Sequence, residues 1–209
     1  MRRMILAIVV LIILFVPAGC GQETAPDIPA AENGGSEAPV SEGPLMARVD
    51  EAPAIDGLTA GYPAEPLEVM GGVIHMAHDG ETLYLHFELA VEGWISIGFN
   101  RTGGGMDGAN MIIGYLDNGS PAYREDLGSG RSHEAVAEGA MQDFYLGYSE
   151  GVAIMEFAYP LEFPSGQGYN LDGLDPGQKY TLILAAHNSS QEIDRSHSSR
   201  GSAEFTVEP

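Results

Sequence analysis

The sequence predicts an all-β domain, a β-sandwich in preference to a barrel, and three observations point to this fold class. Several short segments alternate apolar and polar side chains, which is the pattern of a half-buried strand. Turn sequences such as Asn-Gly, Asp-Gly and Ser-Glu-Gly separate these segments, and about eight to ten strands at such spacing are typical of sandwiches and barrels. No stretch of ten residues combines a helical period with caps, so we expect little helix.

The alternation is clearest in Thr82–Leu89, where leucines and a phenylalanine lie on one face and polar residues on the other. His86 is on the polar face, so we expect it to be exposed to solvent. Ala109–Leu116 is apolar on both faces, which favours a central strand. Further segments have strand-like alternation or flank a turn: His75–Ala77, Trp94–Phe99, Ala122–Glu125, Phe144–Tyr148, Val152–Ala158, Tyr180–Ala186 and Ala203–Val207.

The N-terminus has the features of an export signal. Two arginines precede an apolar run at Met4–Val16, which has the length of a signal h-region and is too short to span a bilayer comfortably. The run leads into Pro-Ala-Gly-Cys20, which resembles a bacterial lipoprotein box except that leucine is usual where Pro17 stands. We therefore expect a signal peptide at residues 1–19, a lipid on Cys20 and an extracytoplasmic location in the cell envelope. Ordinary signal cleavage is the alternative.

The remainder of the chain divides into a tether and one domain. Residues 20–45 are rich in Pro, Ala, Glu, Gly and Ser, so they bury too little surface to offset the entropy of ordering. We expect a disordered tether there, and contact with the membrane through the lipid anchor only. Residues 46–209 are long enough and apolar enough for one folded domain. Cys20 is the only cysteine, which excludes an intrachain disulfide.

Charge and missing motifs exclude two classes of function. The chain has 30 acidic and 9 basic residues, a net charge of −21, and a surface this acidic repels nucleic acid and anionic lipid headgroups. The sequence has no Gly-x-Ser-x-Gly elbow, no His-Glu-x-x-His, no phosphate loop and no dinucleotide fingerprint. We therefore expect a protein that does not bind nucleic acid and is not an enzyme.

One methionine stands in an unusual place. Met106 lies in a loop between two apolar segments, after Gly103–Gly105 and shortly before Gly108. A thioether normally fills gaps in a core, and one use that requires it in a polar, glycine-rich loop is soft ligation of a haem iron. The glycines would allow the backbone to approach a flat macrocycle closely. The alternative is a loop methionine that packs under a neighbouring strand.

Three pieces of the sequence, spread over most of the expected domain, resemble a known family. These are Ala54-Ile55-Asp56-Gly57, the segment from Gly93-Trp94 to Gly98-Phe99 with Met106-Asp107-Gly108-Ala109-Asn110-Met111 after it, and His197-Ser198-Ser199-Arg200-Gly201-Ser202. Together they resemble the DOMON domain, the immunoglobulin-like β-sandwich found beside copper monooxygenases and in the cytochrome domain of cellobiose dehydrogenase. The family is divided between haem b binders and proposed binders of sugars or small molecules.

The resemblance implies candidate ligands. In haem-binding relatives a methionine in the loop after the Gly-Trp strand and a histidine near the C-terminal end hold the iron, which matches Met106 and His197. Arg200 would bind a haem propionate or a sugar acid, and the alternative is that it neutralises one of the many nearby carboxylates. The sequence has no Cys-x-x-Cys-His, so any haem b would be held non-covalently. Methionine and histidine ligation leaves no open position on the iron, which suits electron transfer with a redox partner outside the cytoplasmic membrane.

Two other functions stay open. A pocket without iron would bind a sugar or another small extracellular ligand, with His133, His187 and Trp94 as further candidate residues. A plain scaffold would act through its acidic face. Each of these residues also has a structural interpretation, with His133 solvated in a loop, His187 a polar residue at a strand end, and Trp94 an anchor of the core.

Overall fold

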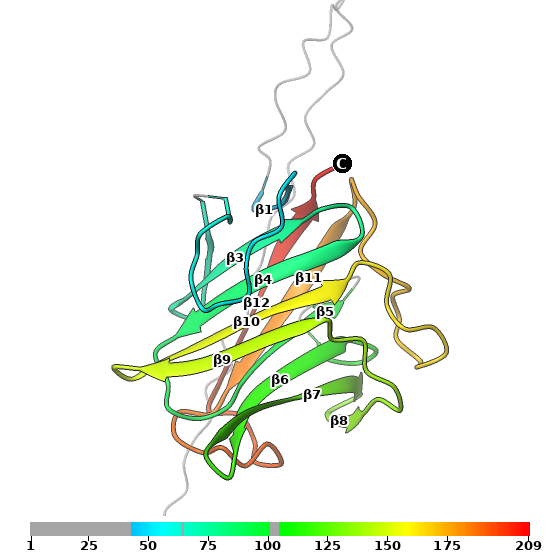
Figure 1. The fold of residues 1–209 in the computed structure, drawn as a ribbon. Helices are drawn as coiled ribbons and strands as arrows, with labels where there is room; N and C mark the ends of the chain where they lie inside the picture. Colours follow the sequence, from blue (N-terminus) through cyan, green and yellow to red (C-terminus); the bar gives the residue numbers. More distant parts are fainter. Residues whose placement is uncertain (1–42, 64, 101–104) are drawn as a thin grey trace, which may run out of the picture. The chain divides into compact units, whose positions relative to one another are not determined.

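The computed structural model describes residues 43–63, 65–100 and 105–209, and its regular structure is made of β-strands (Figure 1). The strands in chain order are β1 (Leu45–Arg48), β2 (Leu67–Val69), β3 (Gly72–His78), β4 (Thr82–Leu89), β5 (Ile95–Asn100), β6 (Asn110–Asp117), β7 (Ser120–Ser129), β8 (Ser132–Ala135), β9 (Asp143–Ser149), β10 (Val152–Pro160), β11 (Lys179–Ala186) and β12 (Ser199–Val207). Within these residues no helix is long and apolar enough to cross a membrane.

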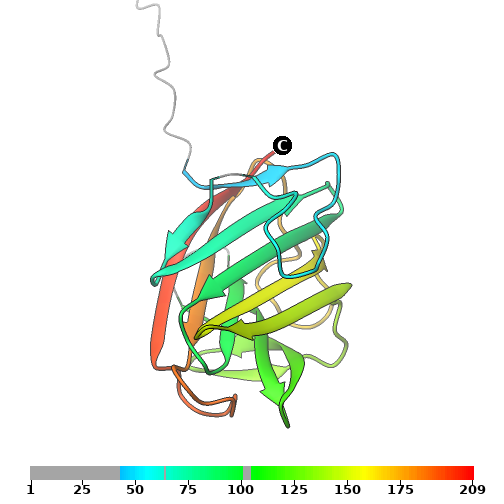
Figure 2. The ribbon, with the colours of Figure 1, turned by 60° about the vertical axis from the view of Figure 1, so that its left-hand side comes forward.

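The strands form two layers that face each other (Figures 1 and 2). Sheet A has the order β8-β7-β6-β5-β11-β12, and sheet B has the order β3-β4-β10-β9 with β2 paired to β3. The short strand β1 belongs to both sheets, because its first half pairs in parallel with β12 and its second half with β3. The predicted all-β sandwich is therefore confirmed, and one strand joins its two sheets.

The hydrophobic core lies between the sheets. Sheet B contributes Phe87 and Phe157, and sheet A contributes Ile97, Phe99 and Phe205, all of them fully or almost fully buried. These residues occupy alternate positions of their strands, so the opposite positions point away from the core. The outward faces of the two sheets are consequently not part of this core.

The expected strands are all present, but three details differ. The last strand begins at Ser199 rather than Ala203, and β7 continues to Ser129. The first four residues of β12 lack apolar alternation, yet their backbone pairs with β11 through Ala186↔Ser199 and Ala185↔Arg200. The short strands β1, β2 and β8 were not expected, since three or four residues are too few for a recognisable period.

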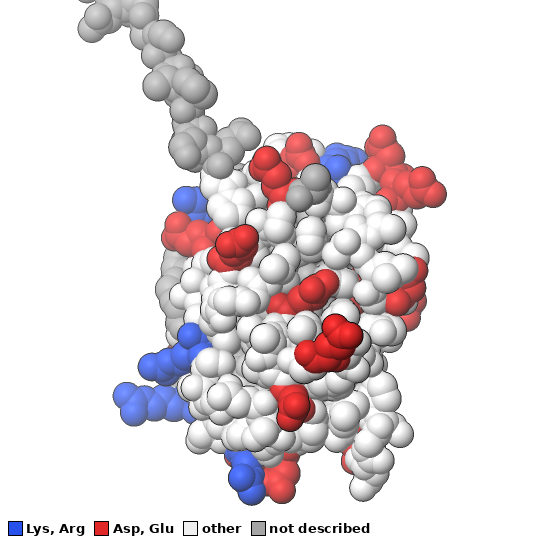
Figure 3. All heavy atoms as spheres, turned by 90° about the vertical axis from the view of Figure 1, so that its left-hand side faces the viewer, with Lys and Arg blue, Asp and Glu red and all other residues white. Residues whose placement is uncertain are grey.

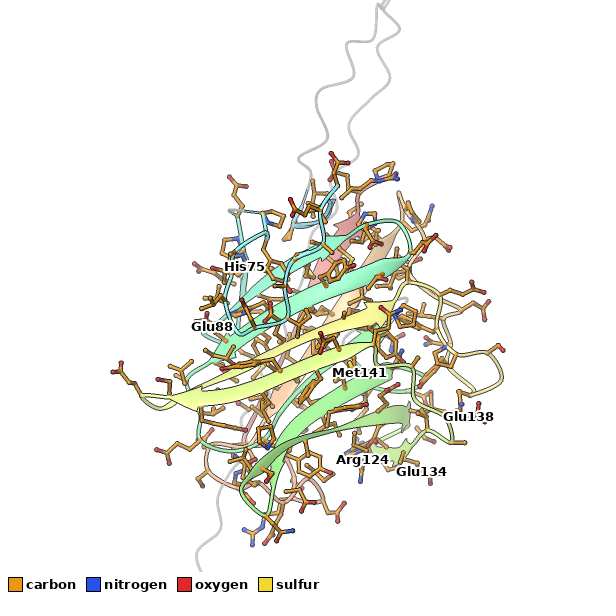
Figure 4. The ribbon with its side chains drawn as sticks, viewed as in Figure 1. His75, Glu88, Arg124, Glu134, Glu138 and Met141 are labelled. Atoms are coloured by element: carbon orange, nitrogen blue, oxygen red, sulfur yellow. The ribbon has the colours of Figure 1, made fainter. Side chains whose placement is uncertain are left out.

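The expectation that His86 is exposed is wrong. Its side chain is completely buried on the outer face of sheet B, because the segment between β1 and β2 covers that face. Tyr62 of this segment packs its ring against those of His75 and His86, each at 6.1 Å between centroids. The backbone N–H of Gly57 donates to Glu156 Oε2 at 2.6 Å. His75 and Glu88 are labelled beside this segment in Figure 4.

The predicted signal peptide and Cys20 lie outside the described residues, as does almost all of the tether predicted at residues 20–45. These assignments, and the boundary at residue 46, therefore stay predictions.

Candidate functional site

A cavity of about 680 Å³ lies on the outer face of sheet A. On β5, Ile95, Ile97 and Phe99 point into the core, so Ser96 and Gly98 between them point outward. Pairing across the sheet carries this face onto the neighbouring strands, through Ser96↔Ala185, Gly98↔Ile183 and Gly98↔Met111. The cavity is lined by Ser96, Gly105, Met106, Met111, Gly130, Arg131, Ile183, Leu184, Ala185, His197, Arg200, Gly201 and Ser202.

Small and apolar side chains form the floor of this cavity. Met111 and Ile183 are buried and cluster with Ala109. Gly98 lies between them, and a Cβ atom there would come within 2.9 Å of Ile183 Cγ1 and of Met111 Cγ. Such a distance forces a neighbour to move, so glycine keeps the floor at this depth.

Met106 reaches the cavity from the loop that precedes β6. Its side chain packs against the Ala109, Met111 and Ile183 cluster, and its carbonyl accepts a hydrogen bond from Ala109 N at 3.0 Å. The loop is pressed against β7, because a Cβ atom on Gly128 would collide with the Met106 carbonyl oxygen. The position of Met106 is therefore fixed by backbone contacts as well as by packing.

Two asparagines hold the Met106 loop in place through hydrogen bonds to its backbone and to each other. The Asn100 amide is buried and donates to the carbonyls of Gly105 and Asp107, at 2.9 and 3.2 Å. The Asn170 amide donates to Asn100 Oδ1 at 2.7 Å, and Asn170 N donates to the Gly108 carbonyl at 2.9 Å. These bonds satisfy buried polar groups that a loop over a sheet would otherwise leave unpaired. Sequence reasoning missed both asparagines, because nothing in the sequence brings Asn170 to this loop.

His197 and Arg200 reach the same cavity from the opposite end of the strands. Ser198 N donates to the Ala186 carbonyl at 2.8 Å, so His197 lies at the level where Ala186 pairs with Ile95. The Met106 loop lies at the other end of β5, where it contacts Asn100. These two levels are five residues apart along β5, or roughly 16 Å. The two predicted haem ligands therefore line one cavity and approach it from opposite ends.

Arg131 is a lining residue that sequence reasoning missed. It is at the tip of the β7–β8 hairpin, where Ser129 pairs with Ser132. The tip is attached to the Met106 loop, because Gly130 N donates to Asp107 Oδ1 at 2.7 Å. A turn sequence such as Gly-Arg carries no sign of this contact, since it depends on the approach of two distant segments.

The alternative pocket residues His187, Trp94 and His133 do not line the cavity. His187 closes a turn, with its Nδ1 accepting hydrogen bonds from Ser189 N at 3.2 Å and Ser190 N at 2.9 Å. Trp94 is buried directly before β5 and is not a member of the hydrophobic core between the sheets or of the two smaller clusters. No donor or acceptor within the described ranges pairs with its indole Nε1.

His133 takes part in a charged group on β7 and β8. It bonds Asp126 through Nδ1, and Arg124 donates to the same carboxylate with two bonds of 2.6 Å. Asp126 is completely buried, which alone would raise the pKa of its carboxyl group, but His133 and Arg124 outweigh that effect and lower it. The group therefore fixes the β7–β8 hairpin, which lies in the lower part of Figure 4 with Arg124 and Glu134 labelled.

The cavity has donors for a metal ion that is already bound by another ligand, such as a porphyrin. The described residues contain no group of three or more His, Cys, Asp and Glu side chains that could hold a bare metal ion. Met106 and His197 add one thioether and one imidazole at opposite ends of the cavity. Two donors of this kind are what the iron of a porphyrin requires on its two open sides.

The chain is similar to several proteins of known structure. The cytochrome domain of Myriococcum thermophilum cellobiose dehydrogenase is similar at a TM-score of 0.50 with 10% identity, over 76% of this chain and 79% of that chain. The cytochrome b domain of pyranose dehydrogenase from Coprinopsis cinerea gives a TM-score of 0.49 with 11% identity, over 65% of this chain and 76% of that chain.

A third structure is a family 9 carbohydrate binding module from Caldicellulosiruptor kristjanssonii in complex with glucose. It has a TM-score of 0.42 and 9% identity, over 78% of this chain and 94% of that chain.

None of the curated proteins matches the chain. A family model described as the DOMON domain matches residues 74–187, which is more than half of the 209 residues. This protein is therefore a member of the DOMON domain family.

Proposed function

We propose that this domain binds haem b non-covalently and transfers electrons outside the cytoplasmic membrane, without catalysing a reaction of its own. The observation that carries the proposal is that Met106 and His197, from loops about ninety residues apart in the sequence, line one cavity from opposite ends. The thioether and the imidazole are the axial donors of a six-coordinate, electron-transfer haem, and methionine ligation raises the reduction potential of the iron.

The rest of the cavity supports a flat, largely apolar ligand. Its volume of about 680 Å³ lies within the range of roughly 300–1,000 Å³ for cofactor sites. Met111 and Ile183 form an apolar floor, and Gly105, Gly130 and Gly201 contribute no side chain to the walls. Asn100 and Asn170 hold the Met106 loop in place, so little ordering of the thioether would be needed on binding.

The proposed location and partner follow from the ends of the chain and from its charge. The signal peptide, the lipid on Cys20 and the tether would place the domain in the cell envelope, attached to a membrane only through its lipid. The chain has a net charge of −21, so the domain would bind the cationic surface of a redox partner. Neither nucleic acid nor an anionic membrane surface is a suitable partner for this charge.

The visible spectrum of the full chain, produced with haem available, tests the proposal. We expect a Soret band and the sharp bands of low-spin iron. Met106→Ala removes one axial donor, so it should convert the spectrum to a high-spin form and weaken haem binding by about tenfold or more. Met106→His should keep six ligands and lower the reduction potential, since imidazole replaces the thioether.

Matched controls separate ligation from folding. Met141→Ala removes a partly buried methionine that packs against the core, and His75→Ala removes a histidine on the other sheet; neither should change the haem spectrum. A protein without a Soret band, or one whose band is unaffected by both Met106→Ala and His197→Ala, would rule out haem ligation at this site. Retention of a sugar by a haem-free protein would then favour the carbohydrate alternative.

A further inference from the structure

The cavity on sheet A has the opposite charge to the rest of the protein. The chain has 30 acidic and 9 basic residues. The lining of the cavity nevertheless contains the cationic side chains of Arg131 and Arg200, and no aspartate or glutamate among the described residues. A positive cavity in a negative protein raises the local concentration of anions and repels cations.

The two arginines of the cavity have guanidinium groups that are not used elsewhere in the described structure. Most other basic side chains there are in ion pairs: Arg124 with Asp126, Lys179 with Glu204, and Arg195 with Glu192. Within the same described ranges, Arg131 and Arg200 form no ion pair. Arg48 also forms none, but it does not line the cavity. A guanidinium binds a carboxylate through two parallel hydrogen bonds, so both groups are ready to bind an acid.

The two arginines approach the cavity from different sides of sheet A. Arg200 is on β12 at its pairing with Ala185, whose side chain belongs to the outward face. Arg131 is at the tip of the β7–β8 hairpin, and the sheet order places β7 and β12 on either side of the floor strands β6, β5 and β11. A ligand on the floor therefore has one guanidinium on each flank.

Backbone contacts join Arg131 to the loop that carries Met106. Asp107 follows Met106 and accepts a hydrogen bond from Gly130 N, next to Arg131. Gly108 N donates to the Gly128 carbonyl at 2.7 Å, and Gly128 N donates to the Ala109 carbonyl at 3.0 Å. The thioether and the Arg131 guanidinium therefore belong to one connected unit, and Asp107 acts as its positioning residue.

We propose that the cavity recognises a ligand with free carboxylate groups, and that Arg131 and Arg200 bind those groups. This proposal deepens the proposed function, because haem b carries two propionates. The acid groups and the iron are recognised by different residues, so carboxylate binding can be measured with a porphyrin that contains no iron. Asp107 acts through Gly130 to place Arg131.

The test compares a metal-free dicarboxylic porphyrin, mesoporphyrin, with its dimethyl ester in the same mild detergent. Binding to the full chain is followed by porphyrin fluorescence. We expect the diacid to bind about tenfold more tightly than the diester, with an affinity that falls as salt is raised. Arg131→Gln and Arg200→Gln should each weaken binding of the diacid and leave binding of the diester unchanged. Asp107→Asn should lower the affinity for the diacid less than Arg131→Gln does.

Arg195→Gln is the matched control, because Arg195 is exposed, paired with Glu192 and not part of the cavity; it should have no effect. Equal affinity for diacid and diester would overturn the carboxylate site, and a normal low-spin haem spectrum in the same protein would leave the proposed function standing. The reverse result, a diacid preference lost in Arg131→Gln without any Met106-dependent haem spectrum, would support the site and reject the electron-transfer function.

Discussion

At the scale of single residues, a histidine and two glutamates form a charged group on the outer face of sheet B. His86 is completely buried between Glu88, at 2.9 Å from its Nε2, and Glu156, at 3.7 Å from its Nδ1. Burial alone lowers the pKa of His86, but the two carboxylates outweigh burial and raise it. Glu156 also accepts the Gly57 N–H, so the charge of this group holds the segment that covers the sheet.

The stability of the protein should therefore fall as the pH rises past the pKa of His86. A raised pKa in the folded state gives stabilisation that is complete below about pH 6.5, the ordinary value for histidine, and is lost as the pH rises through the folded-state pKa. His86→Gln leaves the buried Glu156 carboxylate without a cationic partner, so it should cost about 3 kcal/mol at pH 6 and less at pH 9. Urea unfolding at the two pH values measures both effects.

The control is His75→Gln, because His75 lies on the same face but bonds the Pro63 carbonyl rather than a carboxylate. An identical loss of stability at both pH values for His86→Gln would show that folding does not raise the pKa of His86.

Residue motifs led to part of the cavity lining, while the roles assigned to these residues stay predictions. The Gly-rich loop and the segment from His197 to Arg200 identified Met106, His197 and Arg200, and the structure brings all three to one cavity. Arg131 could not be found this way, because its role depends on where a hairpin tip lies. His86 was placed on the correct face of its strand, but the covering segment that buries it was not predictable from alternation.

At the scale of elements, period-two alternation was sufficient for strands whose side chains face a core. It failed at the start of β12, where Ser199-Arg200-Gly201-Ser202 has no apolar pattern and is held by backbone pairing to β11. That failure concerns the site directly, because β12 carries Arg200 into the cavity. The loop before β6 likewise has no periodic signal, and its conformation depends on Asn100 and Asn170.

Removing the Asn100 amide should loosen the Met106 loop. Asn100→Ala leaves the Gly105 carbonyl without its donor and the Asp107 carbonyl with only the longer bond from Asn170, so the free energy of unfolding should fall by about 1–3 kcal/mol. Backbone amides of Gly108 and Ala109 should exchange hydrogen faster, which mass spectrometry of peptides from this loop can detect. Asn188→Ala, at an exposed position between β11 and β12, is the control. Unchanged exchange in the loop would show that Asn100 does not hold it.

At the scale of the whole molecule, negative charge dominates. Figure 3 shows acidic side chains distributed over one face, while most of the basic side chains visible there lie toward one side. The large excess of acidic over basic residues creates self-repulsion in the folded state that opposes compactness. Ions of added salt screen this repulsion over about 10 Å at 0.1 M.

The protein should therefore become more stable as salt is raised. If salt weakens the charge repulsion so that the free energy of unfolding rises by about 1 kcal/mol, Tm should rise by roughly 2–4 °C for a domain of this size. Thermal unfolding in 10 mM and 300 mM sodium chloride measures the change. Glu138→Lys, at an exposed position, should reduce the salt dependence more than Glu138→Gln does. A Tm that is independent of salt would mean that self-repulsion contributes nothing measurable to stability.

The shared strand β1 has a mechanical consequence. It pairs in parallel with β12 through Leu45↔Thr206 and Met46↔Val207, close to the C-terminus. Tension between the two ends of the domain would thus act along paired strands and load their hydrogen bonds together in shear, rather than opening them one by one. Because β1 also pairs with β3, the same pull is shared by both layers.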